Sequence, residues 1–306
     1  MLPVIHIGYP KSGTTTLQKA LFARHPQIAS LGEPREHEQA LQAARAAWAS
    51  CDANPRKYRP LDQDKARALW RNALADCPPG TVPVFSKETL TLPDFYNGPA
   101  DDRMARALRA VVGDVRIVIV IRQQIRMIES LFLFQAKGPK YQEPARWIEE
   151  QADKMALLDF QTLISIYAAV FGRENVGVFL FEHLQKDPME FARAIARFIG
   201  VDEAQAADLI MGERHNERVS QRYLMYAKLR KKLGLYVPIG ALLPAGMKDR
   251  FNAFMRSGKR AQFRLPDDLV AKLENDYRKS NSLLLKDWNL PLAEFNYPLD
   301  GASAMR

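Results

Sequence analysis

Residues 3–16 read Pro-Val-Ile-His-Ile-Gly-Tyr-Pro-Lys-Ser-Gly-Thr-Thr-Thr, an apolar run that becomes a loop of Gly, Ser and Thr with one lysine. The β-branched residues at its start predict a buried strand, and apolar residues at helical spacing follow the loop. Backbone N–H groups at the start of such a helix attract anions. We therefore expect a strand, a phosphate-binding loop and a helix, rather than a plain strand-to-helix turn.

The position of the lysine indicates which kind of phosphate loop to expect. Gly8 and Gly13 have the spacing of the Walker A pattern G-x-x-x-x-G-K-[ST], but Thr14 stands where that pattern has its lysine. The only lysine of the loop is Lys11, whose side chain can fold back over a bound group. Further hydrogen-bond donors are the hydroxyl groups of Ser12, Thr14 and Thr15. Such a loop suits transfer of the terminal group of a nucleotide by positioning and charge, without the usual triphosphate and metal.

At residues 9–15, Tyr-Pro-Lys-Ser-Gly-Thr-Thr, the sequence resembles the 5′-phosphosulfate loop of the sulfotransferases that use 3′-phosphoadenosine 5′-phosphosulfate (PAPS). The resemblance implies that PAPS is the cofactor and 3′-phosphoadenosine 5′-phosphate the product, with no metal required. It implies transfer of a sulfuryl group to a hydroxyl or amine of an acceptor such as a glycan, a lipid or a small molecule. The loop residues that it assigns to the cofactor are Lys11, Ser12, Gly13, Thr14, Thr15 and Thr16.

A second motif follows the clearest strand of the chain. Residues 115–121, Val-Arg-Ile-Val-Ile-Val-Ile, are almost continuously apolar, which predicts a parallel strand covered on both faces. Arg122 comes next, and Ser130 lies eight residues on, in a predicted helix over 123–135. In the sulfotransferase family an arginine and a serine at this spacing hold the 3′-phosphate of the cofactor. The family often has Asn-Pro or Asp-Pro after the arginine, where this chain has Gln123-Gln124.

The strand and helix pattern predicts an α/β protein. Apolar strand segments occur at residues 4–7, 28–32, 82–86, 115–121 and 176–181, with helical segments between them. Together with the resemblance this indicates a P-loop-like three-layer fold, with a central five-stranded parallel sheet flanked by helices, helical insertions and a helical C-terminal region. We expect residues 1–306 to form a single domain. Its cofactor-binding core is expected at about 1–35, 82–135 and 176–220, with the helical insertions and the C-terminal part on the substrate side.

The reaction also needs a charge for the leaving oxygen and a base for the acceptor. Lys11 is the candidate for the leaving oxygen, and Lys87, directly after the third strand, for a second contact beside the sulfuryl group. Cytosolic members of the family have a histidine shortly after such a lysine, but here Glu88 follows. Glycan-modifying members use a glutamate after the second strand, past a His-Pro pair. His25-Pro26 and Glu33 match that placement, so Glu33 is preferred as the base over Glu88 and Glu36, although Glu33 and Glu36 could also be ordinary charges at a helix start.

Several other residues have weaker interpretations. Residues 176–201 are interpreted as structural, with a turn at Phe181-Glu-His-Leu184 and Asp187 as the N-cap of the next helix. His6 is interpreted as a satisfied core residue. A loop with Arg214, Asn216 and Arg218 is expected to close over the nucleotide.

Composition narrows the classes of protein. The 306 residues are 47% hydrophobic and carry a net charge of +9, which indicates a folded protein with anionic ligands. The densest basic cluster is Lys228 to Lys232, and no nucleic-acid recognition motif appears. Cys51 and Cys77 form neither a disulfide framework nor a metal-ligand pattern. No apolar run approaches the ~20 residues of a membrane span, so we expect a soluble, bacterial-type, cytoplasmic protein, and peripheral contact with a membrane stays open.

Two other classes of protein share the loop and the sheet. A P-loop nucleotide kinase would have the Walker lysine, which is absent here. A non-catalytic nucleotide-binding protein would need the same cradle without Lys11 and without a base. Both stay as alternatives to the sulfotransferase.

Overall fold

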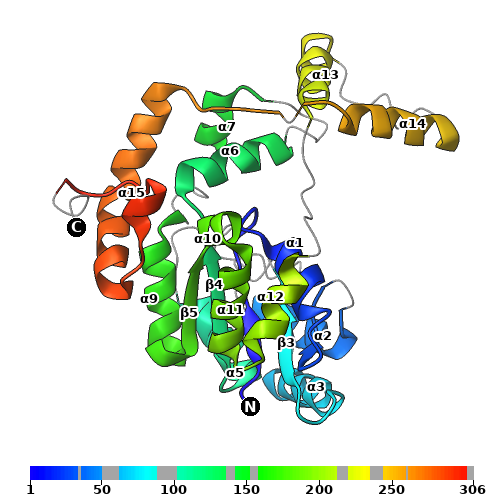
Figure 1. The fold of residues 1–306 in the computed structure, drawn as a ribbon, viewed down its shortest axis with the longest axis vertical. Coiled ribbons are helices and arrows are strands. Elements are labelled where there is room, and N and C mark those ends of the chain that lie inside the picture. Colours follow the sequence, from blue (N-terminus) through cyan, green and yellow to red (C-terminus); the bar gives the residue numbers. More distant parts are fainter. Residues whose placement is uncertain are drawn as a thin grey trace. The chain divides into compact units, whose positions relative to one another are not determined.

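The structure is a computed structural model that describes residues 1–33, 36–49, 62–87, 102–135, 142–151, 158–211, 220–234, 244–259 and 261–301. Its contacts divide the chain into two compact units (Figure 1). The first unit consists of Met1–Gln123, Asp153–His215 and Tyr277–Arg306, and the second of Gln124–Ala152 and Asn216–Asp276. That the whole chain acts as a single domain stays a prediction.

The first unit is built on a five-stranded sheet in the order β2-β3-β1-β4-β5, in which every pair is parallel. The strands are β1 Val4–His6, β2 Ile28–Ser30, β3 Val82–Ser86, β4 Arg116–Ile121 and β5 Val176–Leu180. The predicted strands are thus confirmed, and the differences in their bounds are one or two residues. Because all strands run the same way, the segments that follow them leave from one edge of the sheet, where ligands bind in open α/β folds.

Helices cover both faces of the sheet, which confirms the predicted three layers. On one face the core joins alternate residues of β4, Val118 and Val120, to residues of three helical segments. These segments are η1 Leu17–Phe22, α11 Pro188–Ile199 and α12 Glu203–Met211. Helix α9, Phe160–Phe171, contacts β4, β5 and α5, Arg103–Val112. Helices α2, Glu38–Ala49, and α3, Gln63–Ala75, pack against each other and against α5.

The helix after the phosphate loop differs from the predicted α-helix. It begins with one α-helical turn, α1 Thr14–Thr16, and continues as the π-helical segment η1. In η1 the Ala23 N–H group donates to the Gln18 carbonyl oxygen, five residues back. The Gln18 side chain is buried and its amide donates to the Ser86 hydroxyl group at 3.1 Å. The wider turns thus accompany a polar contact with β3, and such π-helical turns are frequent near functional sites.

The helices predicted over 123–135 and after Asp187 are confirmed, whereas α9, α12 and a helix over Pro144–Glu150 were not predicted. The turn expected after β5 is instead a short helix, α10 Phe181–Lys186, whereas Asp187 is the expected N-cap of α11 and accepts from the Glu190 N–H group at 3.0 Å. Helix α9 was not predicted, although its buried residues have helical spacing. The remaining helical segments are α6 Gln124–Gln135, α7 Pro144–Glu150, η4 Arg173–Asn175, α13 Gln221–Lys232, α14 Ala245–Arg256, α15 Asp267–Trp288 and η6 Leu292–Phe295.

Candidate active site

The loop after β1 has an unusual backbone. Gly13 has a φ of 87° and Lys11 a φ of 66°, and a non-glycine residue in this left-handed region is uncommon. Arg122, directly after the neighbouring strand β4, donates from Nη1 to the Lys11 carbonyl oxygen at 2.8 Å. This hydrogen bond fixes the peptide group after Lys11 and so offsets part of the cost of its conformation. The loop is therefore held in shape by a charged residue from the next strand.

Two hydroxyl groups of the loop point back into it. Ser12 Oγ donates to the Tyr9 carbonyl oxygen, and Thr14 Oγ1 makes a weaker contact of 3.5 Å with the same oxygen. Both side chains are buried, whereas Thr15 is exposed and Thr16 is half-buried. A hydroxyl group has one hydrogen to donate, so Ser12 and Thr14 brace the loop in this structure. Outward donors come from Thr15 and from the first N–H groups of the helix, which have no partner within it.

A histidine lies directly beneath the loop. His6 is fully buried in β1, and its Nδ1 atom is 2.8 Å from Ser86 Oγ. A Cβ atom on Gly8 would lie 2.5 Å from His6 Nε2, so the ring occupies the space under the glycine. Within the described part of the chain Nε2 has no hydrogen-bond partner. Burial lowers the pKa of His6 to about 3, so the ring is neutral at physiological pH. His6 is thus only half satisfied, which the sequence did not indicate.

Helix α10 packs against the other side of the loop. A Cβ atom on Gly13 would lie 2.7 Å from Leu184 Cδ2 and 3.1 Å from a ring carbon of Phe181. The Phe181 ring also lies under the Arg122 guanidinium, 4.6 Å from its centre. Gly13 is therefore needed both for its positive φ and for the close approach of α10.

Next to Arg122 lies a hydrogen-bond network that the sequence did not predict. Glu182, the second residue of α10, accepts from the Gln123 N–H group at 3.0 Å and from the Tyr297 hydroxyl group at 3.1 Å. Burial, together with the charge of Glu182 and its hydrogen bond, raises the pKa of Tyr297 well above its ordinary value, and the positive charge of Arg122 opposes this shift. Gln123 also donates to the Asn296 carbonyl oxygen at 3.2 Å. A signal for Glu182 was present, because it follows the strand next to β4; none marked Tyr297.

Ser130, the other predicted ligand of the 3′-phosphate, is half-buried in α6. Helix α6 belongs to the second unit and Arg122 to the first. A joint phosphate site of Arg122 and Ser130 therefore stays a prediction.

The predicted acceptor end contains one lysine between two glutamates. Lys87 Nζ lies 2.8 Å from Glu33 Oε1 and forms a second ion pair with Glu36 Oε1. Gly32 allows this, because a Cβ atom there would lie 2.4 Å from the Ser86 carbonyl oxygen. Burial by itself lowers the pKa of Lys87, but the hydrogen bonds and charges of Glu33 and Glu36 outweigh it and raise the pKa. The side chain of Lys87 is 19% exposed and that of Glu33 48%, so the described residues do not shield Glu33 from water. Glu88, Arg214, Asn216 and Arg218 lie outside the described residues.

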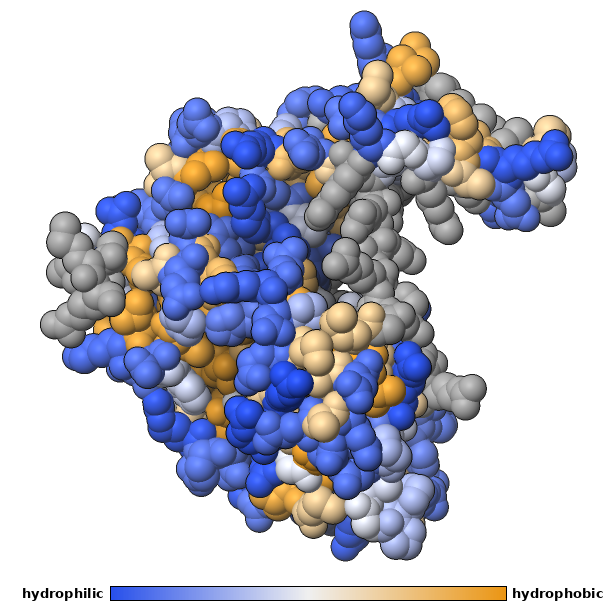
Figure 2. Space-filling view, in the orientation of Figure 1, coloured by the Kyte–Doolittle hydropathy of each residue, from blue (hydrophilic) through white to orange (hydrophobic). Residues whose placement is uncertain are grey.

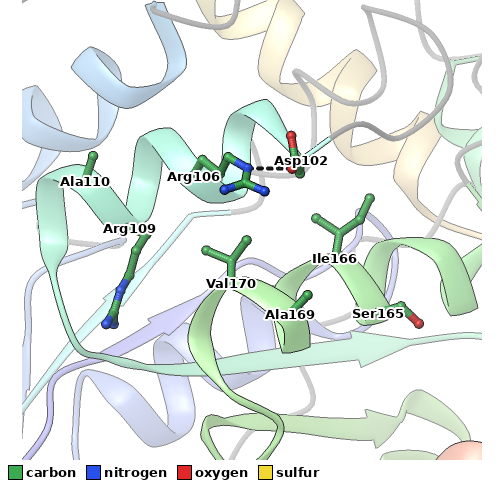
Figure 3. A pocket seen from close by; sticks show the side chains of 8 residues that line it. All are labelled: Asp102, Arg106, Arg109, Ala110, Ser165, Ile166, Ala169 and Val170. Carbon is green, nitrogen blue, oxygen red and sulfur yellow. Dashed lines mark hydrogen bonds and ion pairs between the residues drawn. The ribbon is translucent and has the colours of Figure 1, made fainter.

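A groove of about 590 Å³ lies between α5 and α9, away from these residues (Figure 3). Its charged lining is already paired. Arg106 forms an ion pair with Asp102, while Arg109 donates to the Gly113 carbonyl oxygen at 2.9 Å and pairs with Asp114. None of the predicted site residues lines the groove.

The described residues contain no group of three or more His, Cys, Asp or Glu side chains that could hold a metal ion. In the same part of the chain, none of the helices combines the length and the apolar character that crossing a membrane requires.

The sequence model of the sulfotransferase family matches residues 3–205, which is more than half of the chain. The chain belongs to the sulfotransferase family. A comparison with curated protein sequences found no match.

The chain is similar to solved structures of sulfotransferases, of which one supports the fold. A sulfotransferase from Alicyclobacillus acidocaldarius is 17% identical, has a TM-score of 0.51, and aligns over 79% of this chain and 98% of its own. The sulfotransferase domain from the Synechococcus PCC 7002 olefin synthase is 15% identical, has a TM-score of 0.42, and aligns over 75% of this chain and 94% of its own. At 17% identity the likeness to the Alicyclobacillus acidocaldarius sulfotransferase concerns the fold alone.

Proposed function

We propose that this sulfotransferase moves a sulfuryl group from PAPS to a hydroxyl or amine group of an acceptor such as a glycan, a lipid or a small molecule. The observation that carries the proposal is the loop after β1, in which Lys11 is held in a left-handed conformation by Arg122. A lysine within the loop, in place of the lysine after the second glycine, is what separates this reading from a nucleotide kinase.

The residues of the loop fit the phosphosulfate end of PAPS. The first turn of α1 presents backbone N–H groups and the exposed Thr15 hydroxyl group to an anion. Gly8 and Gly13 let the backbone approach closely, since a side chain at either position would collide with neighbouring atoms. Lys11 adds a full positive charge. Arg122 has a planar guanidinium that suits a phosphate group, and in our proposal Arg122 and Ser130 hold the 3′-phosphate.

When bound, PAPS supplies an activated sulfuryl group whose transfer leaves negative charge on a phosphate oxygen. In our proposal Lys11 Nζ donates to that oxygen and stabilises the charge as it develops. The fixed loop keeps Lys11 in place before the reaction, so little reorganisation is needed.

Glu33 acts in this proposal as the base that takes the proton from the acceptor. Its ion pair with Lys87 orients the carboxylate and lies at the same edge of the sheet as the loop. In our proposal Lys87 gives up its ion pair with Glu33 to contact the sulfuryl group. Its ion pair with Glu36 then remains. Glu88 stays the second candidate for the base. We place the reaction in the cytoplasm and without a metal ion.

Isothermal titration tests the proposal against its two alternatives. We expect binding of 3′-phosphoadenosine 5′-phosphate in preference to ADP, without Mg²⁺, and transfer of sulfate from PAPS in a mass-spectrometric screen of hydroxyl acceptors. Binding of ATP that requires Mg²⁺ would instead support a nucleotide kinase. Tight binding of the nucleotide that is unaffected by Lys11→Ala, with no transfer to any acceptor, would support a non-catalytic binding protein.

A further inference from the structure

Helices α13 and α14 of the second unit form a built pair. The Tyr226 and Phe251 rings meet edge to face with their centres 5.6 Å apart. Arg222 of α13 lies over the Phe254 ring of α14, 4.6 Å from its centre, and donates to Ser257 Oγ at 2.7 Å. A ring contact, a cation–π contact and a hydrogen bond therefore hold the two helices together.

Large apolar residues are exposed among basic ones on one side of α13 and just after its last residue, Lys232. Met225, Leu229 and Leu233 follow each other at four-residue steps, so they share one side of the helix. Their exposed fractions are 65%, 54% and 60%. The buried side of the same helix carries Leu224 and Ala227 together with the buried Arg230. Helix α13 thus has apolar residues on two sides, and those of one side are exposed to solvent.

Helix α14 continues this character. Met247 and Phe254, seven residues apart and therefore on the same side of the helix, are both more than half exposed. Figure 2 shows hydrophobic residues at the surface among hydrophilic ones where Figure 1 draws α13 and α14. Several large apolar side chains exposed on one helix pair mark a binding surface more often than a single exposed residue does.

The positive charge of the chain is concentrated around this patch. Residues 220–234 and 244–259 hold nine Lys or Arg residues and one Asp, a net charge of +8 out of +9 for the whole chain. Lys228 and Lys232 precede Leu229 and Leu233 and are exposed. In the described part of the chain neither lysine, nor Lys248 on α14, forms an ion pair with an acidic side chain. Their charge is available to an anionic partner.

We propose that the α13–α14 surface docks on the face of an anionic phospholipid bilayer. Helices that lie in the membrane interface combine an exposed apolar side with flanking lysines and arginines, which contact the acyl boundary and the anionic head groups. A nucleic acid would pair with the lysines but leave Met225, Leu229 and Leu233 in water, and an apolar protein partner would leave the charge without a complement. The bilayer surface uses both. This inference does not depend on the sulfuryl transfer, because its test measures binding alone.

Sedimentation of the full chain with lipid vesicles tests the proposal. We expect binding to vesicles of phosphatidylcholine mixed with phosphatidylglycerol, weaker binding to pure phosphatidylcholine, and a further decrease as salt is added. The double variant Lys228→Gln with Lys232→Gln should bind roughly 30-fold more weakly, because each charge near an anionic surface is worth about fivefold. Leu229→Ser should weaken binding roughly tenfold through the lost apolar contact. Circular dichroism of each variant verifies that it is folded.

Matched controls come from the exposed surface of other helices. Lys272→Gln with Lys279→Gln on α15 removes the same charge elsewhere, and Met211→Ser on α12 removes an exposed apolar side chain elsewhere. Both controls should bind as the parent does. Equal loss in the α15 control, equal binding to charged and neutral vesicles, or no binding at low salt would overturn the proposal. So would tighter binding to a single-stranded oligonucleotide that the α13 variants abolish, since this would make the surface a nucleic-acid site.

Discussion

Two groups of charged residues lie at the same edge of the sheet and are held in different ways. At the loop after β1, the backbone of Lys11 is fixed by a hydrogen bond from Arg122, and buried groups brace the loop from below. After β2 and β3, Lys87 is held by ion pairs with Glu33 and Glu36, whose side chains are partly exposed. Such exposed pairs are worth about 0–1 kcal/mol and rearrange easily.

The difference indicates a division of labour within the proposed site. The cofactor end must be in place before charge develops, and its buried contacts give that order. The acceptor end must release a carboxylate or an ammonium group when substrates arrive, and weak ion pairs permit it. Substitutions should therefore separate the two ends by what they change: chemistry alone at the acceptor end, and both chemistry and nucleotide binding at the loop.

The largest effect is expected at the acceptor end. Glu33→Gln keeps the size of the side chain but cannot take a proton, so turnover should fall by ~10²–10⁴-fold, the usual worth of a positioned base. Affinity for 3′-phosphoadenosine 5′-phosphate should be nearly unchanged, because Glu33 contacts the acceptor in our proposal. Single-turnover rates and titration of the nucleotide measure the two effects separately.

Glu36→Gln is the matched control, since Glu36 makes the same ion pair with Lys87. We expect it to lower turnover much less than Glu33→Gln. If Glu33→Gln keeps near-parental turnover while Glu88→Gln is inactive with nucleotide binding intact, the base lies after the third strand.

A strong loss of turnover is also expected at the loop. Lys11→Ala removes the charge that stabilises the leaving oxygen, so turnover should fall by at least ~100-fold. The effect on binding of the desulfated product should be smaller, because less charge sits on that oxygen before transfer. Lys19→Ala, an exposed lysine of the following helix, is the control and should behave as the parent. Loss of binding equal to the loss of turnover would show that Lys11 only holds the nucleotide.

The sequence predicted the parts of this site that follow a local pattern. Val115 to Ile121 is a nearly continuous β-branched run, and such a run forms a buried parallel strand in almost any context. The phosphate loop was predictable from the identity and position of Gly13 and Lys11. That Lys87 and Glu33 lie close to each other followed from the topology, because parallel strands bring their carboxyl ends to one edge of the sheet.

The parts that the sequence did not predict depend on contacts between distant residues. The Tyr297 hydroxyl group meets Glu182 across more than a hundred residues, and no periodicity marks that pairing. The direction of the Ser12 hydroxyl group depends on the turn at Tyr9. The half-satisfied state of His6 depends on how closely Gly8 approaches it, which only the packed structure shows.

An intermediate effect is expected where the loop is held from outside. Arg122→Ala removes a charge-assisted contact with the proposed 3′-phosphate, worth about 1.5–3 kcal/mol, so nucleotide affinity should fall roughly 10- to 150-fold. It also removes the hydrogen bond to the Lys11 carbonyl oxygen, so turnover at saturating PAPS should fall as well. Arg116→Ala, at the opposite end of β4, is the control. Unchanged nucleotide binding in Arg122→Ala would count against Arg122 as a phosphate ligand.

The smallest effect concerns the histidine beneath the loop and its dependence on pH. The pKa of His6 is about 3 in the folded chain because of burial, and its ordinary value is 6.5. Between these two values the unfolded chain binds a proton that the folded chain does not, so the free energy of unfolding must fall as the pH is lowered through 6.5 toward 3. The slope from this one group approaches about 1.4 kcal/mol per pH unit, or tenfold in the ratio of folded to unfolded chain.

In His6→Asn this contribution is absent. Urea unfolding from pH 7 to pH 5 should therefore show a difference in stability between parent and variant that is largest at pH 7 and shrinks as the pH falls. His183→Asn, a half-exposed histidine of α10, controls for replacing a histidine elsewhere in the first unit. A parent-to-variant difference at His6 that is the same at every pH would mean that the ring is protonated as easily in the folded chain as in the unfolded chain. The loop would then rest on a solvated group, and the contrast between a fixed cofactor end and an adaptable acceptor end would lose its physical basis.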